Sequence, residues 1–109
     1  GDVADSDIIG RKIADSFWAL YASRGYIDAH GVPRSVEDLA SHTFVGFDES
    51  MASHRASQWL ATIPQGRIVA RNNSVLGLIY AAKAGVGLAP LPTAIGDNDA
   101  DLVRVLGPI

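Results

Sequence analysis

Polar side chains that could bind an anion follow a predicted strand in the second half of the sequence. Asn72, Asn73 and Ser74 end the alternating run from Gly66 to Asn72 and directly precede a helical pattern. Asn73 and Ser74 are N-cap residue types, because their side chains accept hydrogen bonds from the free amides of a first helical turn. Those amides and the helix dipole also favour an anion, and Arg71 is adjacent. Simple capping explains the same residues, so both interpretations stay open.

A second candidate contact lies at the carboxyl end of another predicted strand, from Thr43 to Phe47. Gly46, Phe47 and Asp48 mark this end. If the two strands are parallel neighbours, their ends meet at one edge of the sheet, which is where ligands bind in open α/β sheets. Phe47 would then form an aromatic wall, and Gly46 would let a ligand approach the backbone. The alternative is that Phe47 belongs to the core and Asp48 is a solvated turn residue.

The sequence gives little support to catalytic or metal chemistry. No Gly-x-Ser-x-Gly motif occurs, although a hydrolase needs a nucleophile, a base and an orienting acid. His30, His42 and His54 include no His-x-x-x-His pair, so we predict no metal site. His30 and His42 fall at predicted helix ends, where a solvated histidine is ordinary. Gly85-Val86-Gly87 lacks the third glycine of a dinucleotide signature, and we predict no catalytic residue and no cofactor.

A strand, a helix and a second strand must position the first candidate site. Period-two alternation places Ile68, Ala70 and Asn72 on one face of the first strand, so either Arg71 or Asn72 faces a ligand, but not both. The helix that follows has an apolar face of Val75, Leu78, Ile79, Ala82 and Val86. Gly85 or Gly87 can end it, and the apolar run from Leu88 to Leu91 predicts a buried strand closed by Pro92. Together these segments form a βαβ unit with parallel strands.

The remaining segments continue the alternation of strands and helices. Predicted elements are a central strand at Phe17–Ala22, a helix at Arg24–His30 capped by Ser23 and stopped at Gly31, a short helix at Val36–Ser41 after Ser35, a helix from a Ser53 cap to Thr62 or Ile63 before Pro64, a turn at Thr93–Ile95 and an edge strand at Leu102–Leu106. This order predicts an α/β fold of three layers with an open, mostly parallel sheet. Because it begins and ends with strands, it can be one lobe of a larger protein.

Composition narrows the class of protein. The 109 residues suffice for a single domain with a modest core, and the 48% apolar content excludes a disordered chain. No apolar run reaches the roughly 20 residues of a membrane span, so we expect no membrane partner. The chain has no cysteine, which fits a reducing compartment. A net charge of −3 argues against nucleic-acid binding by this segment alone.

Several motifs, in this order and at these spacings, resemble the effector-binding region of LysR-type transcriptional regulators. The segments that carry the resemblance are Trp18–Ser23, Tyr26–Gly31, Pro33–Ala40, Asn72–Ser74, Ala84–Pro92 and Leu102–Leu106. They span nearly the whole chain. One departure is Arg24-Gly25, which stands where the family often has proline and a small residue.

The resemblance implies a type II periplasmic-binding-protein-like fold, in which two lobes close on a small-molecule effector. Residues 1–109 would be the second lobe, with hinge crossings near Ile13 to Trp18 and after Leu106. The family's winged helix-turn-helix would lie outside this chain, so DNA would be bound only through that absent domain. The full protein would be a cytoplasmic regulator of transcription and a homo-oligomer, usually a tetramer. An anionic or aromatic effector would contact Gly46, Phe47, Asp48, Asn72, Asn73 and Ser74.

Two other classes of protein fit the sequence less well. A lobe of an extracytoplasmic solute-binding protein would share the fold, and a signal peptide in the full gene would favour it. A small α/β enzyme is the third possibility, and loss of turnover on changing one histidine would support it.

Overall fold

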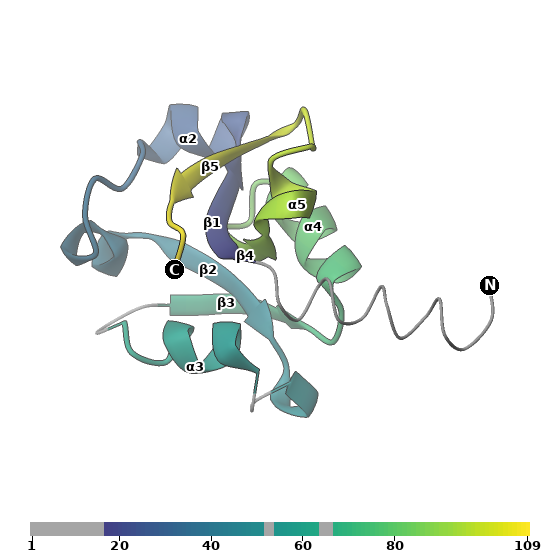
Figure 1. The fold of residues 1–109 in the computed structure, drawn as a ribbon. Helices are drawn as coiled ribbons and strands as arrows, with labels where there is room; N and C mark the ends of the chain where they lie inside the picture. The colour runs from purple at the N-terminus through teal and green to yellow at the C-terminus, as the bar shows by residue number, and fades with distance from the viewer. Residues whose placement is uncertain (1–16, 52–53, 64–66) are drawn as a thin grey trace.

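The computed structural model describes residues 17–51, 54–63 and 67–109 (Figure 1). The elements in chain order are β1 (Trp18–Ser23), α2 (Arg24–His30), the 3₁₀ helix η1 (Glu37–Ser41), β2 (Thr43–Phe47), the 3₁₀ helix η2 (Glu49–Met51), α3 (Arg55–Leu60), β3 (Arg67–Asn72), α4 (Val75–Lys83), β4 (Ala89–Pro92), α5 (Thr93–Gly96) and β5 (Leu102–Leu106). The predicted order of strands and helices is therefore confirmed over the described residues.

The strands form two connected groups. β1 lies between β4 and β5 and is antiparallel to both, whereas β2 and β3 are a parallel pair. A parallel bridge between Phe44 and Leu88 joins the groups. Two hydrogen bonds hold this bridge, from Val45 N to Leu88 O (2.8 Å) and from Leu88 N to Thr43 O (2.9 Å). Consequently β2, β3, β4 and β5 share one direction and only β1 opposes them, which agrees with an open, mostly parallel sheet.

The βαβ unit runs through β3, α4 and β4. Ser74 is the N-cap of α4, and its side chain accepts a hydrogen bond from Gly77 N at 3.1 Å. Gly85 has φ of 80°, the left-handed conformation that ends a helix at little cost only in glycine. Val86 lies beyond the last residue of α4 and is 37% exposed, so it does not belong to the apolar helical face.

Helices cover both faces of the β2–β3 pair, which gives the three layers. On one face, Leu78 and Ala82 of α4 pack with Val45 of β2 in a cluster that also holds Trp18 and Tyr21. A second cluster lies on the opposite face. Its buried residues are Leu20, Ala22, Tyr26, Leu39, Phe44, Leu60, Ile63, Leu88 and Val105. α3 contributes Leu60 to this second cluster and thereby closes the other side of β2.

A β-bulge in β3 changes which of its residues share a face. Phe44 pairs with Ile68, but Val45 pairs with Ala70, so Val69 is an extra residue in the ladder. We call the cluster on the α4 face the α4 cluster and the second cluster, on the opposite face, the α3 cluster. Ile68 therefore packs against the α3 cluster, whereas Ala70 packs against the α4 cluster. The predicted strict alternation is wrong here, because a bulge shifts the side-chain pattern by one residue. Asn72 and Ile68 consequently do not share a face.

Helix starts differ from the prediction at two places. The helix predicted at Val36–Ser41 after Ser35 is the 3₁₀ helix η1, which starts at Glu37 and has Val36 as an N-cap without a side-chain hydrogen bond. Ser23 caps α2 as expected, accepting from Tyr26 N at 3.1 Å. α3, however, is capped by His54, whose Nδ1 accepts from Ala56 N at 3.1 Å. Ser53, Pro64, Gly66 and the first hinge crossing as far as residue 16 lie outside the described residues.

The entry and exit of the described chain lie side by side. Ile109 N donates to Trp18 O at 2.8 Å, and Thr93 N donates to Phe17 O at 2.8 Å. Since β1 opposes the other strands, its first residue lies at the same end of the sheet as the last residues of β2, β3, β4 and β5. We call this end of the sheet the strand-end edge.

Candidate functional site

The two predicted strand ends meet at the strand-end edge. Phe47 pairs with Asn72 in the parallel ladder, and Gly46 pairs with Arg71. Asp48 N extends the ladder by donating to Asn72 O at 2.8 Å. The two strands are therefore parallel neighbours, which is the condition under which their ends were expected to meet, and the start of α4 stands at the same edge.

The residues from Asn72 to Ser74 build the turn that starts α4. Asn72 Oδ1 accepts from Asn73 N at 2.9 Å and lies 3.5 Å from Ser74 Oγ. A Cβ placed on Gly77 would be only 2.0 to 2.2 Å from the carboxamide atoms of Asn72, so that amide lies directly against the helix. Asn73 and Ser74 are exposed. Asn72 therefore positions the helix, whereas Asn73 and Ser74 remain accessible at its first turn.

The residues at the end of β2 have different roles. Phe47 is 2% exposed and belongs to the α4 cluster, with its ring 6.1 Å from that of Trp18, so the core interpretation holds for this side chain. A Cβ on Gly46 would meet Ile68 and Leu60 side chains at 3.3 and 3.4 Å, so side chains of the chain itself occupy the space beside this glycine. Asp48 Oδ1 accepts from the backbone N (3.0 Å) and Oγ (2.5 Å) of Ser50.

His54 is a polar residue at this edge that the sequence prediction missed. Its ring lies 4.7 Å from the Trp18 ring and 5.4 Å from the Phe47 ring. Burial lowers the pKa of His54, and the charge of Arg55 lowers it further. Because Nδ1 accepts from Ala56 N, the neutral ring carries its proton on Nε2. The only signal in the sequence was its position before a helical pattern, which asparagine or serine would have marked more clearly.

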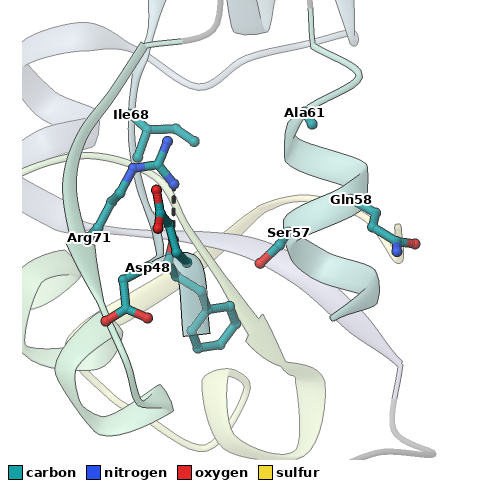
Figure 2. Close-up of a pocket in the computed structure, with 8 residues that line it drawn as sticks. Asp48, Ser57, Gln58, Ala61, Ile68 and Arg71 are labelled. Carbon is teal, nitrogen blue, oxygen red and sulfur yellow. Dashed lines mark hydrogen bonds between the residues drawn. The ribbon is translucent and has the colours of Figure 1, made fainter. Parts of the chain in front are cut away.

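A pocket of about 530 Å³ lies between α3 and β3, on the face of the sheet opposite to α4 (Figure 2). We call it the α3–β3 pocket. Its lining residues are Phe47, Asp48, Glu49, Ser57, Gln58, Ala61, Ile68 and Arg71. The bulge at Val69 explains why Ile68 and Arg71, three residues apart, both line it. Of the two alternatives at the end of β3, Arg71 therefore lines a cavity, whereas Asn72 faces α4.

Charges of both signs line this pocket. Arg71 Nη1 donates to Phe47 O at 3.0 Å, which fixes the guanidinium group above the end of β2. Asp48 and Glu49 contribute carboxylates, and Ser57 contributes a hydroxyl whose oxygen is buried without a hydrogen-bond partner among the described residues. Two of the predicted contact residues, Phe47 and Asp48, line this pocket, and the other four do not.

Another buried polar pair lies far from both sites. His42 is 5% exposed and its Nδ1 is 2.7 Å from the Tyr26 hydroxyl, so the prediction of a solvated His42 is wrong. Burial lowers the pKa of His42, and the charge of His30 lowers it further. Among the described residues, no group of three or more potential ligands could hold a metal ion. None of the helices within the described ranges is long and apolar enough to cross a membrane.

The chain belongs to the LysR substrate-binding domain family, whose model matches residues 1–108. An uncharacterized HTH-type transcriptional regulator of Haemophilus influenzae is 31% identical over 100 residues, covering 87% of this chain and 34% of that protein. The HTH-type transcriptional regulator CrgA of Neisseria meningitidis serogroup C is 30% identical over 106 residues, covering 91% and 34%. This chain thus spans about a third of the length of these relatives.

Solved structures agree with the family. The regulatory domain of CrgA, a LysR-type transcriptional regulator, matches with a TM-score of 0.66 and 29% identity over 84% of this chain and 47% of that chain. Full-length CbnR, solved in complex with its target DNA, matches with a TM-score of 0.63 over 87% of this chain and 35% of that chain. At 18% identity, the second match shows the shared fold alone. The fold is that of LysR regulatory domains, which is periplasmic-binding-protein-like of type II.

Proposed function

We propose that this chain is the second, effector-sensing lobe of a LysR-type transcriptional regulator. The strand-end edge would form one wall of a cleft, and a first lobe would supply the other wall. A small anionic or aromatic inducer would bind in this cleft. Of the six predicted contact residues, Asp48, Asn73 and Ser74 would meet it from this lobe, and Gly46, Phe47 and Asn72 would position the edge that carries them.

One observation carries the proposal. The carboxyl ends of β2 and β3, the start of α4 and both ends of the described chain lie at the same edge, since Trp18 and Ile109 are joined by a hydrogen bond. A first lobe connected near Trp18 and after Leu106, as the family resemblance implies, would face this edge and the start of α4. Ligands in open α/β sheets bind at this end of the strands.

The wider function follows from membership of the family. Relatives of this chain are transcriptional regulators, and CbnR has been solved with its target DNA. We infer that the full protein is a cytoplasmic homo-oligomer, that it binds DNA through a domain outside this chain, and that this lobe catalyses no reaction. Effector binding would shift the population towards a closed arrangement of the two lobes, because only that arrangement contacts the ligand from both sides.

Amide chemical shifts of the isotope-labelled chain test the effector site. Candidate organic acids are titrated into the chain and into an Asn73→Asp variant. An added carboxylate stabilises the start of α4 through the helix dipole but repels an anion, so binding should weaken by about tenfold while the melting temperature holds. Asn98→Asp, in the loop after α5, controls for the added charge, and it also removes the hydrogen bond from Asn98 Nδ2 to Ala94 O. Equal affinity of both variants and the parent chain would exclude an anion at this helix start.

A further inference from the structure

We propose that the α3–β3 pocket is a second ligand site, which binds a small zwitterion that carries both an ammonium group and a carboxylate, as an amino acid does. The pocket lies within this lobe, on the α3 side of the β2–β3 pair. It therefore needs no first lobe. Phe47 and Asp48 belong to both this pocket and the proposed effector cleft, whereas Glu49, Ser57, Gln58 and Arg71 belong to the pocket alone.

The positive end of the pocket is Arg71. None of the salt bridges formed by the described residues includes this side chain. The hydrogen bond from Nη1 to Phe47 O holds the planar group in place, and no other described residue accepts from the remaining guanidinium N–H groups. Guanidinium groups bind carboxylates through two parallel hydrogen bonds, so a ligand carboxylate fits here.

The negative end is formed by the turn after β2. Within the described part of the chain, Glu49 forms neither a hydrogen bond nor a salt bridge, and Asp48 uses Oδ1 for Ser50 and leaves Oδ2 unengaged. Opposite charges line one cavity without pairing with each other. A zwitterion satisfies both ends, whereas a simple anion or a simple cation meets one favourable and one repulsive group.

Ser57 supplies an independent indication of a missing partner. Its hydroxyl oxygen is buried and lacks a hydrogen-bond partner among the described residues. In Figure 2 the hydroxyl points from α3 towards the side of the pocket where Asp48 and Arg71 lie. A buried hydroxyl without a partner is unfavourable, so a polar ligand group that pairs with it gains affinity.

The rest of the lining is apolar and sets the size of the ligand. Ile68 and Ala61 contribute apolar side chains, and the volume of about 530 Å³ lies within the range of small-molecule pockets. An aromatic amino acid fits this combination of charge and volume.

Three probes of matched shape test the proposal. Phenylalanine carries both charged groups, 3-phenylpropanoate lacks the ammonium group, and phenethylamine lacks the carboxylate. Each is titrated into the isotope-labelled chain while amide shifts are followed. We expect phenylalanine to shift Glu49, Ser57, Gln58 and Arg71 and to bind at least about tenfold more tightly than either analogue.

Substitutions locate the charged ends. Glu49→Gln and Arg71→Gln should each weaken phenylalanine binding by about tenfold, whereas Glu37→Gln and Arg67→Gln, outside the pocket, should leave it unchanged. Ser57→Ala should weaken binding without lowering the melting temperature, since it removes a buried hydroxyl that has no partner.

Three results would overturn the zwitterion site. These are equal affinities for the three probes, no shifts at the pocket amides up to a probe concentration on the order of 10 mM, or phenylalanine shifts centred on Asn73 and Ser74. The last result would leave the effector cleft supported and the α3–β3 pocket without a ligand. Conversely, shifts confined to the pocket would support this site whether or not the cleft binds an effector.

Discussion

The two faces of the β2–β3 pair differ in how closely a helix packs against them. On the α4 face, buried Leu78 and Ala82 press against β2, and a helical glycine, Gly77, lies directly against the Asn72 amide. On the α3 face, Leu60 packs on β2, but the helix leaves a pocket of about 530 Å³ over β3. The close-packed face fixes the position of the strand-end edge, and the open face has room for a ligand. The strand-end edge can therefore stay fixed by α4 while part of α3 stands away from β3.

Truncation of apolar side chains should give the largest difference in stability between the two faces. Leu78→Ala on the close-packed face should lower the free energy of unfolding by about 2–5 kcal/mol, because the cavity cannot collapse. Ile68→Ala on the pocket face should cost only about 1 kcal/mol, since its side chain is partly exposed already. Urea denaturation of the two variants measures both values. Similar losses would contradict a difference in packing between the faces.

Adding atoms gives the converse test. Gly77→Ala places a methyl group where the Asn72 amide lies and should cost about 1–3 kcal/mol. Ala61→Leu adds three carbons at the rim of the pocket and should change stability by less than about 0.5 kcal/mol. The double variant Gly77→Ala/Asn72→Ala should recover part of the first loss, because the clashing amide is gone. Additive losses in that cycle would place the strain elsewhere.

Capping of α4 contributes a smaller effect at the strand-end edge. Ser74→Ala removes the side chain that accepts from Gly77 N, and we expect a loss of about 1 kcal/mol. Ser74→Asp keeps an acceptor and should retain most of the stability. Amide hydrogen exchange should quicken in the first turn of α4 in the alanine variant alone. Unchanged exchange there would mean that Ser74 does not hold the helix start.

Acid should lower the stability of the chain through His42, which pairs with Tyr26 of the α3 cluster. The pKa of His42 is lower in the folded chain than its unfolded value of about 6.5, so the unfolded chain binds more protons in acid. The stabilisation that the neutral His42 ring provides is present above about pH 6.5 and is lost as the pH falls below this value. The urea midpoint should fall less on acidification in the His42→Gln variant than in the His30→Gln variant. His54 also has a lowered pKa, so part of the decline should remain.

Local residue chemistry made the strands and helix ends predictable from the sequence. Ser23, Ser74 and Gly85 act as the sequence predicts, since each depends only on the backbone beside it. The common direction of β3 and β4 was also predictable from the βαβ pattern.

Features that depend on distant residues were not predictable. Val69 became a bulge because of its register with β2, and this changed the face of Arg71. Tyr26 and His42 meet through tertiary packing, which no spacing reveals. The α3–β3 pocket depends on the distance between the six-residue helix α3 and the strand β3. Neither the helical pattern of α3 nor the alternating pattern of β3 encodes that distance.

The hydrogen bond from Ile109 to Trp18 has a consequence for how such lobes can be exchanged between proteins. A unit whose incoming and outgoing segments lie next to each other can be inserted into a host protein between two adjacent positions without disrupting the fold of the host. Transplanting this segment into a related regulator would therefore demand only a matched pair of junctions, and under the proposed function the recipient would acquire a new effector specificity while keeping its own scaffold.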